Sequence, residues 1–418
     1  MTTTTGHRGR RGQVRVRARG SALAAVAAIA SSAALAACSS SSSSPPASAG
    51  SASSTAPASS TAPGAPLATS LSTATDSWAI VPISANPTSW EVLVRPAKAS
   101  TWQLVTPPGV ADNGGLIAAA DAGSGLTVAA RPSQDLSVTP VSATTDAGAS
   151  WSTKGPISKG VAASPDALAV SGRQLAAVLG NGTVEASSDA GGSWRTLAEP
   201  GTIAASPAGQ KCGTVHVSSV SFGPVPTQVL AAAECGATGT AGLFSYSAGV
   251  GWQRLTLPAS GQLVRLGAGT ALLRTQEGLT ALWADDALHW YAYSPLSSPA
   301  TPTPKSSSAD WTASAPLPVT SALTASGGLA GATATSAGGT WVLLPGGQAA
   351  TIGGPGQQWL LLPPTPAHTE VLASGPGTAL DALAVSGHTL TVWQLDHEST
   401  VWARAQTIRV PIQPDSPS

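Results

Sequence analysis

The residues best suited to covalent chemistry in this sequence are its three cysteines, Cys38, Cys212 and Cys235. Cys38 directly follows the apolar run Ser21 to Ala37, which comes after an arginine-rich start without acidic residues. A basic segment, an apolar run and small residues before a cleavage point make up an export signal, and this run is too short for a comfortable membrane-spanning helix. We therefore expect residues 1–37 to be a signal peptide that is cleaved before Cys38.

The residues Leu35-Ala36-Ala37-Cys38 resemble the lipobox of bacterial lipoproteins. The resemblance implies that the Cys38 thiol carries acyl chains such as palmitate, that Cys38 becomes the mature N-terminus, and that the protein is anchored on the outer face of the cell membrane. Two or three acyl chains suffice for stable anchoring. An uncleaved anchor, or an ordinary signal with an incidental cysteine, is the alternative. The pair Arg10-Arg11 leaves the export route, Sec or twin-arginine, open.

Cys212 and Cys235 flank the strand-like stretch Val215 to Phe222. Export brings them into an oxidising compartment, where an isolated pair of cysteines usually forms a disulfide. Metal binding is a weaker interpretation, because His216 is the only histidine nearby. We expect a Cys212–Cys235 disulfide and no metal.

The composition changes twice along the chain. From Cys38 to residue 75 it is almost entirely Ser, Ala, Pro, Thr and Gly, which cannot bury enough apolar surface to fold, so residues 38–75 are expected to be a disordered linker. From residue 76 to 414, short runs rich in Val, Leu, Ala, Thr and Trp alternate with turn residues about every ten residues, which is typical of an all-β domain. After residue 37, 14 basic and 20 acidic side chains remain, a net charge of −6, so nucleic acid is not an expected partner.

Two turns of this domain share the spacing Ser/Thr-x-Asp-x-Gly-x-x-Trp. The shared positions are Thr144, Asp146, Gly148 and Trp151 in the first turn, and Ser187, Asp189, Gly191 and Trp194 in the second. In such a turn the Asp accepts hydrogen bonds from free backbone N–H groups, the Gly tolerates a positive φ, and the Trp anchors the next strand. These residues predict repeated strand connections rather than a catalytic site.

Tryptophan recurs beyond these two turns at the spacing of one structural repeat. The positions are Trp102, Trp151, Trp194, Trp252, Trp311, Trp359 and Trp402, separated by 43 to 59 residues. A period of this length with about four strands per repeat is typical of propeller blades. We expect a β-propeller over residues 76–414, most simply of seven blades, although six or eight fit the same spacing. The first repeat shows only three strands, so strands from both chain ends are expected to share one closing blade.

The Asp-containing turns resemble the Asp-box, or BNR, repeats of sialidase-like propellers and of the propeller-type photosystem II assembly factors. Sialidases bind a substrate carboxylate with three arginines and use a Tyr/Glu pair and an acidic Asp. Here Val94-Arg95-Pro96 matches the family's N-terminal arginine motif incompletely, and Tyr246, Tyr291 and Tyr293 have no evident Glu partner. The arginines that would have to converge for this activity are Arg95, Arg131, Arg265, Arg274 and Arg404.

No phosphate-binding, nucleophile-elbow or zinc-protease motif occurs in the sequence, and Asp285-Asp286 and Asp396-His397-Glu398 are interpreted as turn residues. The sequence therefore predicts no catalytic residue, no metal and no cofactor. The expected function is that of a membrane-anchored, extracytoplasmic binding or assembly module, with an unidentified protein or polysaccharide partner at the propeller face. The alternative is a glycan-acting hydrolase of the sialidase-like type.

Overall fold

The computed structural model describes most of residues 68–411. The gaps are 74, 84–88, 109–114, 121–124, 132–138, 158–164, 224–226, 237–239, 257–261, 264, 267–268, 271, 276–277, 285–287, 294–310, 318–328, 336–338, 355–356, 376–378 and 398. For 118–120, 240, 241 and most of 262–293 only the backbone is described. Cys38, the signal peptide and most of the expected linker lie outside the described residues.

The first half of the described chain forms four antiparallel sheets. Sheet 1 contains β1 (Thr69–Ser72), β2 (Asp76–Ile83), β3 (Ser89–Pro96) and β4 (Gln103–Leu104). Sheet 2 contains β5 (Leu116–Ala120), β6 (Leu126–Ala130), β7 (Val141–Thr144) and β8 (Ser152–Thr153). Sheet 3 contains β9 (Pro165–Ser171), β10 (Gln174–Leu179), β11 (Val184–Ser187) and β12 (Arg195–Ala198). Sheet 4 follows the short helix α1 (Thr202–Ala205) and contains β13 (Val215–Phe222), β14 (Val229–Cys235), β15 (Thr240–Ser247) and β16 (Gly251–Arg254).

The second half continues the same pattern. Sheet 5 contains β17 (Gln262–Leu263), β20 (Leu272–Thr275), β21 (Gly278–Ala284), β22 (Leu288–Tyr293) and β23 (Trp311–Ala313), beside the separate hairpin of β18 (Arg265–Leu266) and β19 (Gly269–Thr270). Sheet 6 contains β24 (Gly331–Ala334), β25 (Thr340–Leu343), β26 (Ala349–Ile352) and β27 (Leu360–Leu361). Sheet 7 contains β28 (Thr369–Ser374), β29 (Leu380–Ser386), β30 (Thr389–Leu395) and β31 (Ala403–Arg409).

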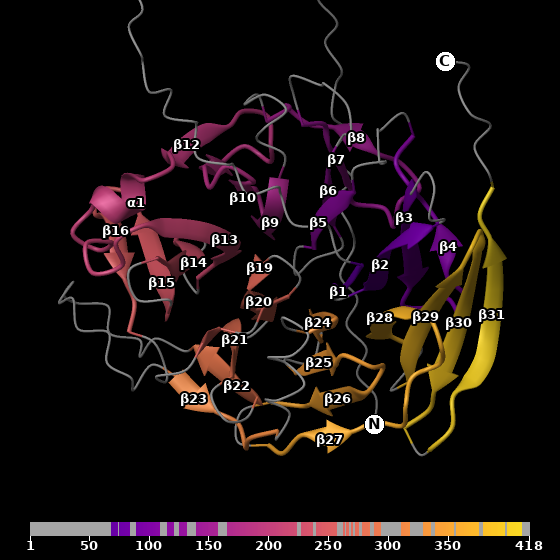
Figure 1. Cartoon of the computed structure of the whole chain (residues 1–418). Helices are drawn as coiled ribbons and strands as arrows, with labels where there is room; N and C mark the ends of the chain where they lie inside the picture. The colour runs from indigo at the N-terminus through magenta and orange to yellow at the C-terminus, as the bar shows by residue number, and fades with distance from the viewer. Residues whose placement is uncertain are drawn as a thin grey trace, which may run out of the picture. The chain divides into compact units, whose positions relative to one another are not determined.

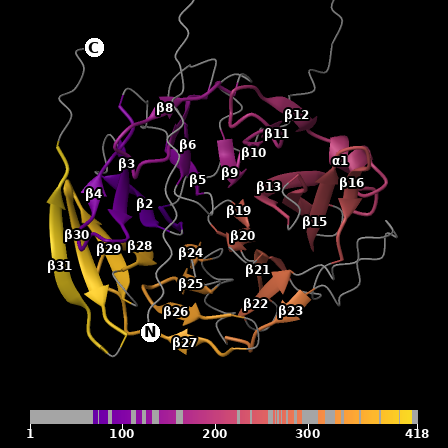
Figure 2. The ribbon, with the colours of Figure 1, turned by 180° about the vertical axis from the view of Figure 1, so that it is seen from behind.

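The sheets follow one another around a ring (Figures 1 and 2). One strand of each sheet lies innermost, and these strands contact one another in the order β1, β5, β9, β13, β20, β24 and β28, with β28 returning to β1. In sheets 1–4, 6 and 7 the strands run outward in chain order, so neighbouring strands are joined by short connections. The prediction of an all-β propeller is confirmed, and α1 is the only helix among the described residues.

The core lies between neighbouring sheets. One cluster joins sheets 1 and 2 around Trp78 and Leu116, another joins sheets 3 and 4 around Val178 and Phe244, and further clusters fill the spaces between sheets 2 and 3, 6 and 7, and 7 and 1. Alanine is frequent in these layers, which allows the sheets to approach closely. Burial of both faces of strands such as β2 and β10 explains why these strands lack a clean polar and apolar alternation.

Five of the seven repeated tryptophans link their sheet to the one before it. Each of these five lies at or near the start of an outermost strand, and its indole N–H donates to a backbone carbonyl near the corresponding strand of the preceding sheet. The donor and acceptor pairs are Trp151 with Val105 (2.9 Å), Trp194 with Gly155 (2.8 Å), Trp252 with Leu197 (3.3 Å), Trp311 with Thr256 (3.1 Å) and Trp402 with Pro363 (3.4 Å). The buried Nε1 of Trp359 has no hydrogen-bond partner in the described part of the chain. The tryptophans therefore act as anchors between repeats.

The expectation of a closing sheet shared by both chain ends is wrong. Sheet 1 is built entirely from Thr69–Leu104 and sheet 7 entirely from Thr369–Arg409. The fourth strand that sheet 1 lacked in the sequence interpretation is β1, which lies inside the expected linker 38–75 and pairs with β2. Ordered structure thus begins before the expected boundary at residue 76. The reason is that β1 has the Ser- and Thr-rich composition of the linker, and its pairing with β2, which leaves Ser70 buried, has no local signal in the sequence.

Side chains hold sheets 1 and 7 together instead. Arg95 Nε lies 3.6 Å from Asp381 Oδ2, and the same oxygen accepts the indole N–H of Trp102 at 2.8 Å. The side chain of Gln406 accepts from the backbone N–H of Trp102 at 2.8 Å and donates to its carbonyl at 2.9 Å. Burial raises the pKa of Asp381, although hydrogen bonds from Trp102 and Gln394 and the charge of Arg95 oppose the shift. We call these four residues, Arg95, Trp102, Asp381 and Gln406, the closing network.

Candidate functional site

The innermost strands carry few ionisable residues, and three of them occupy the same strand position. Asp166, His216 and Glu370 are the second residues of β9, β13 and β28, in strands otherwise made mainly of Ala, Ser, Val, Leu and Thr. Innermost strands of a propeller start at the same face of the ring, so these residues lie around one mouth of it. We call this set the mouth residues and regard it as the candidate site.

Asp166 is the mouth residue with the best-defined surroundings. Arg131, which follows β6, is held in place by its backbone N–H to the carbonyl of Gly115 at 2.8 Å. Its Nη2 lies 3.3 Å from Asp166 Oδ1, and the two side chains are 7% and 21% exposed. The pair joins sheets 2 and 3. Burial raises the pKa of Asp166, while the charges of Arg131 and His216 work in the opposite direction.

Glu370 has a related environment on the last sheet. Burial raises its pKa, and the neighbouring charge of His368 opposes this shift. His368 is exposed and adopts a positive φ of 61°, with its carbonyl accepting the N–H of Val385 at 3.0 Å. Two carboxyl groups of the mouth residues are therefore partly removed from water. Such groups can accept hydrogen bonds from a ligand or exchange a proton with it.

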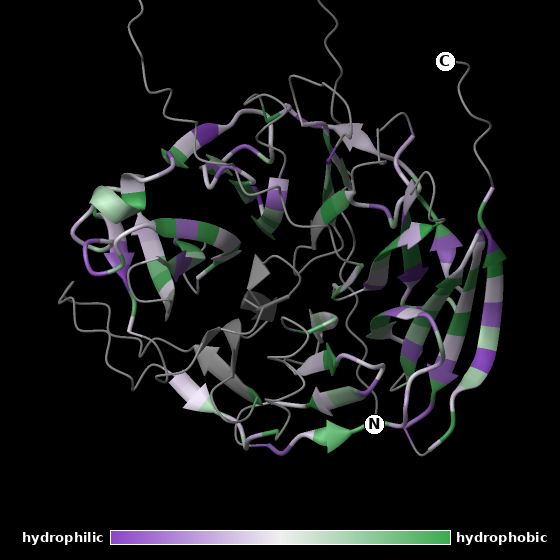
Figure 3. Ribbon diagram, in the orientation of Figure 1, coloured by the Kyte–Doolittle hydropathy of each residue, from purple (hydrophilic) through white to green (hydrophobic). Residues whose placement is uncertain are grey.

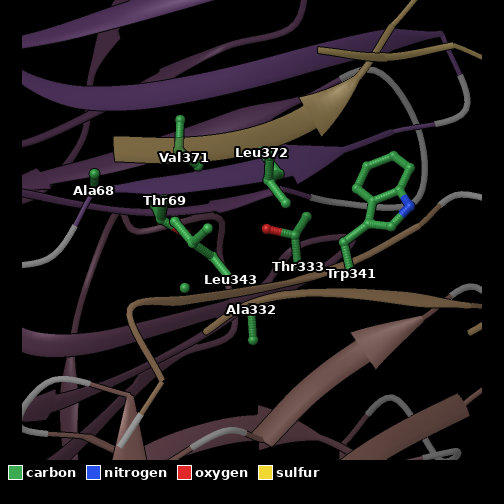
Figure 4. A pocket seen from close by; sticks show the side chains of 9 residues that line it. Ala68, Thr69, Ala332, Thr333, Trp341, Leu343, Val371 and Leu372 are labelled. Atoms are coloured by element: carbon green, nitrogen blue, oxygen red, sulfur yellow. The ribbon is translucent and has the colours of Figure 1, made fainter. Parts of the chain in front are cut away.

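A small cavity lies between the innermost strands of sheets 1, 6 and 7 (Figure 4). Its walls include Thr69, Thr333, Trp341 and Leu372, and its volume is about 30 Å³. Ser70 closes the space beside it, because its hydroxyl contacts Thr333 Oγ1 at 2.7 Å and donates to the carbonyl of Leu372. A space of this size accommodates about one water molecule. This cavity is therefore too small for an organic ligand.

The arginines that the sialidase-like hypothesis requires do not gather where their side chains are described. Arg95 is buried in the closing network, Arg131 pairs with Asp166, and Arg404 is exposed on the outermost strand β31. Arg265 and Arg274 lie on β18 and β20, and their side chains are outside the described part. Of these five arginines, the three with described side chains therefore lie in three separate parts of the molecule.

The described tyrosine has a packing role. The ring of Tyr246 lies 5.3 Å from that of Trp252 at an angle of 54°, between β15 and the start of β16. The side chains of Tyr291 and Tyr293, and the pair Asp285-Asp286, fall outside the described residues. Asp396 is exposed in the turn after β30, as a turn residue would be.

The two Asp-containing turns connect β7 to β8 and β11 to β12 with the same hydrogen bonds. Asp146 Oδ1 accepts the N–H of Ser150 and Asp189 Oδ1 accepts the N–H of Ser193, both at 2.9 Å. The hydroxyls of Thr144 and Ser187 donate to the same carboxylate oxygens at 2.8 and 2.7 Å. The same hydroxyls also accept the N–H groups of Gly148 at 3.0 Å and Gly191 at 2.8 Å.

The turns contain features that the sequence interpretation missed. Ala147 and Ala190 adopt positive φ angles of 55° and 61°, directly before the glycines that also have positive φ. Gly148 is needed for a second reason, since a Cβ there would lie 2.6 Å from Val105 Cβ of the preceding sheet. Ser150 and Ser193, which the motif left as variable positions, donate their hydroxyls to the Asp carboxylates. Both copies have Ser directly before the Trp, and this shared residue could have indicated the role from the sequence.

A disulfide joins Cys212 and Cys235, which are 23 residues apart and fully buried. Cys212 precedes β13 and Cys235 ends β14, and both belong to the core between sheets 3 and 4. No group of three or more His, Cys, Asp or Glu residues in the described part could hold a metal ion. The described residues also contain no helix with the length and apolar character needed to cross a membrane.

Comparisons with known proteins give structural neighbours only, since no family model and no curated protein matches the chain. YCF48 bound to D1 peptide has 15% sequence identity and a TM-score of 0.45, covering 73% of this chain and 86% of that one. YCF48 from Cyanidioschyzon merolae has 14% identity and a TM-score of 0.44, covering 80% and 94%. A GH74 xyloglucanase from Xanthomonas campestris has 16% identity and a TM-score of 0.48, covering 79% of this chain and 52% of that one. The fold assignment itself rests on the sheets described above.

Proposed function

We propose that this protein is a non-catalytic binding or assembly module, held on the outer face of the cell membrane by lipid on Cys38. The propeller would present its mouth residues to a protein or polysaccharide partner. The membrane part of the proposal rests on the signal-like residues 1–37 and the lipobox-like end at Cys38. The tether-like composition of the following residues supports a domain that stands clear of the lipid surface.

One observation carries the binding function: of the five candidate arginines, the three with described side chains lie in separate structural positions. Arg95 and Arg131 each pair with an acid of a neighbouring sheet, and Arg404 lies far out on β31. A carboxylate-binding arginine cluster, which a sialidase-like mechanism needs, is not assembled from these side chains. A ring with a rigid frame and polar groups at its mouth is instead suited to recognition.

We also infer two finer features of the fold. Each of the sheets numbered 1 to 7 is taken as one blade, because each contributes one strand to the closed inner ring. The turns at 144–151 and 187–194 are assigned to the Asp-box type, on their shared residues and their matching hydrogen bonds. Neither feature specifies an activity.

Asp166 favours a second candidate function, hydrolysis of a glycan. A carboxyl group with a raised pKa is what a general acid requires, and burial raises the pKa of Asp166 although the charge of Arg131 opposes the shift. A glycosidase also needs a second carboxylate on the opposite side of the scissile bond. Glu370 is the other carboxyl group among the mouth residues and so the candidate for this role, although burial raises its pKa and the role requires the ionised form.

The test uses the full mature chain in two assays. First, the protein is immobilised and incubated with solubilised native envelope, and retained proteins and polysaccharides are identified. Second, the same preparation is incubated with fluorogenic glycosides, with Asp166→Asn as the matched variant. Specific retention of a partner without turnover is the expected result. Turnover that Asp166→Asn abolishes would replace the binding function with the hydrolase.

A further inference from the structure

The outermost strand of sheet 7 differs from the outermost strands of the other sheets. β31 has 7 residues, whereas β4, β8, β12, β16, β23 and β27 have 2 to 4. It pairs with β30 over its length and has no strand on its other side among the described residues. Short outermost strands prevent unwanted strand pairing, and β31 lacks this protection.

The backbone of β31 presents free groups along that open edge. Val410 donates its N–H to the carbonyl of His388 at 2.9 Å, so position 410 bonds toward β30. Backbone groups of an antiparallel strand alternate in direction, so Thr407 and Arg409 direct their N–H and C=O groups away from the sheet. The side chains of Gln406 and Ile408 face sheet 1, where Gln406 bonds to Trp102 and Ile408 packs on the core. Side-chain contacts with sheet 1 therefore hold β31 in place, while its outward backbone groups have no paired strand among the described residues.

The positive charge of β31 favours a partner with acidic side chains. Arg404 and Arg409 are exposed near its two ends, and β31 contains no acidic residue. Neither arginine forms an ion pair with an acid of the described part, where the ion pairs are Arg95–Asp381 and Arg131–Asp166. Figure 3 shows the hydrophilic bands near both ends of β31. Just before the strand, Val401 is 70% exposed.

We propose that β31 is a docking edge for an extended acidic segment of another protein, which adds to sheet 7 as a further antiparallel or parallel strand. Main-chain hydrogen bonds to Thr407 and Arg409 hold such a segment, and its acidic side chains pair with Arg404 and Arg409. An aliphatic residue of the segment covers Val401. This surface is separate from the mouth residues of the proposed function.

The sequence argues against occupation by this chain itself. Residues 39–75 contain no acid, and residues 412–418 contain one acid, Asp415, between Pro414 and Pro417. Proline cannot supply the N–H groups of a paired strand. A second copy paired antiparallel through β31 would bring its Arg404 and Arg409 close to those of the first copy, and like charges on paired strands repel. The arginines therefore disfavour self-pairing and favour an acidic partner.

The test measures binding of a fluorescein-labelled peptide of about ten residues that alternates Glu and Val, long enough to span β31. A peptide alternating Lys and Val is the charge control. The full mature chain should bind the acidic peptide with a micromolar dissociation constant that rises with salt, and the Lys peptide about tenfold more weakly or not at all. Absence of binding at about 1 mM protein would overturn the proposal.

Two variants separate charge from strand addition. The double variant Arg404→Glu, Arg409→Glu should weaken binding by about tenfold or more, whereas Arg195→Glu, at the exposed first position of the outermost strand β12, should leave it unchanged. Thr407→Pro removes an outward N–H without touching the bonds to β30, so it should also weaken binding by about tenfold. Unchanged binding by Thr407→Pro would show that charge alone holds the peptide and would overturn strand addition.

Amide hydrogen exchange on the wild-type chain provides a test that needs no variant. Peptide binding should slow exchange at Thr407 and Arg409, and it should leave Val410, which already donates to His388, unchanged. Equal exchange with and without saturating peptide would overturn the proposal. Because the mouth residues play no part in this assay, its failure would leave the proposed function untouched.

Discussion

Trp102 donates its indole N–H to the buried carboxylate of Asp381, 279 positions further along the chain, at 2.8 Å. Arg95, with its Cζ 5.8 Å from the Trp102 ring centre, pairs with the same carboxylate. This contact replaces the strand exchange that often closes a propeller. Loss of one charge would leave the other buried without an opposite charge beside it, which is costly.

Asp381→Ala should therefore lower the free energy of unfolding by about 3 to 5 kcal/mol. The double variant Arg95→Met, Asp381→Leu removes both charges and should recover most of that loss, because no unpaired charge remains. Urea unfolding of the wild type, Arg95→Met, Asp381→Leu and the double variant measures the coupling between the two side chains. Additive effects of the two single changes would show that the pair does not act as a unit.

The indole hydrogen bonds between sheets can be tested with Trp194. Trp194→Ala removes a ring that packs against the core between sheets 2 and 3, and it should cost about 3 kcal/mol as a large-to-small change. Trp194→Phe keeps most of the packing but loses the bond to Gly155, with an expected cost of about 1 kcal/mol.

Trp359→Phe is the matched control for that hydrogen bond, since the buried Nε1 of Trp359 has no partner in the described structure. Its cost should be clearly smaller than that of Trp194→Phe in the same urea titration. Equal costs would assign the effect to ring shape and not to the hydrogen bond.

The Asp-containing turns predict a pH dependence. Hydrogen bonds from the Ser193 N–H and from the Ser187 and Ser193 hydroxyls lower the pKa of Asp189 to about 2. A lowered native pKa stabilises the fold above the ordinary pKa of the group, and this contribution disappears as the pH falls through the native value. The melting temperature of Asp189→Asn should therefore lie below that of the wild type at neutral pH. The difference should shrink between about pH 4 and about pH 2. A difference that stays constant over this range would contradict the assignment.

Lipidation of Cys38 remains a prediction that needs its own experiment. If the thiol carries lipid, Cys38→Ala should move the protein from the membrane fraction to the soluble extract, because the acyl chains supply the anchoring energy. Immunoblotting of both fractions measures the shift, and Ser40→Ala, two residues further along, serves as the control substitution. Full retention of Cys38→Ala in the membrane would place the anchor elsewhere.

The disulfide should be present in the exported protein. Alkylation followed by intact mass, with and without reductant, should detect Cys212 and Cys235 as blocked until reduced. On the chain-entropy model, closing a loop of this length stabilises by roughly 3 kcal/mol, so Cys235→Ala should lower stability by a similar amount. Two alkylated thiols without reductant would refute the bond.

The sequence predicted the repeating parts of this fold because their residues act locally. Asp146 and Asp189 bond within their own turns, and the tryptophans recur at one position in each repeat. The strand β1 was missed, since Thr-Ser-Leu-Ser has the composition of the linker and only pairing with β2 identifies it. The shared closing sheet was predicted wrongly for the same reason.

The candidate site was largely hidden from sequence reasoning. Arg131 was named only as one of several arginines, and Asp166 was not singled out, because an acid at the start of a strand usually lies in solvent. Their pairing at 3.3 Å depends on two sheets meeting in space. The raised pKa of Asp166 depends on burial, which no local pattern records.

Closure without strand exchange also has a consequence for the order of folding. Each of sheets 1 to 4, 6 and 7 is a continuous piece of chain, so it can form without waiting for a distant part of the chain. One side of sheet 1, with Ala79, Val81 and Leu93, must wait for sheet 7 before it is covered. Contacts between distant parts of a chain form slowly. This apolar face of sheet 1 therefore stays uncovered until the last sheet of the chain has formed, and in that interval it is the surface most open to a chaperone.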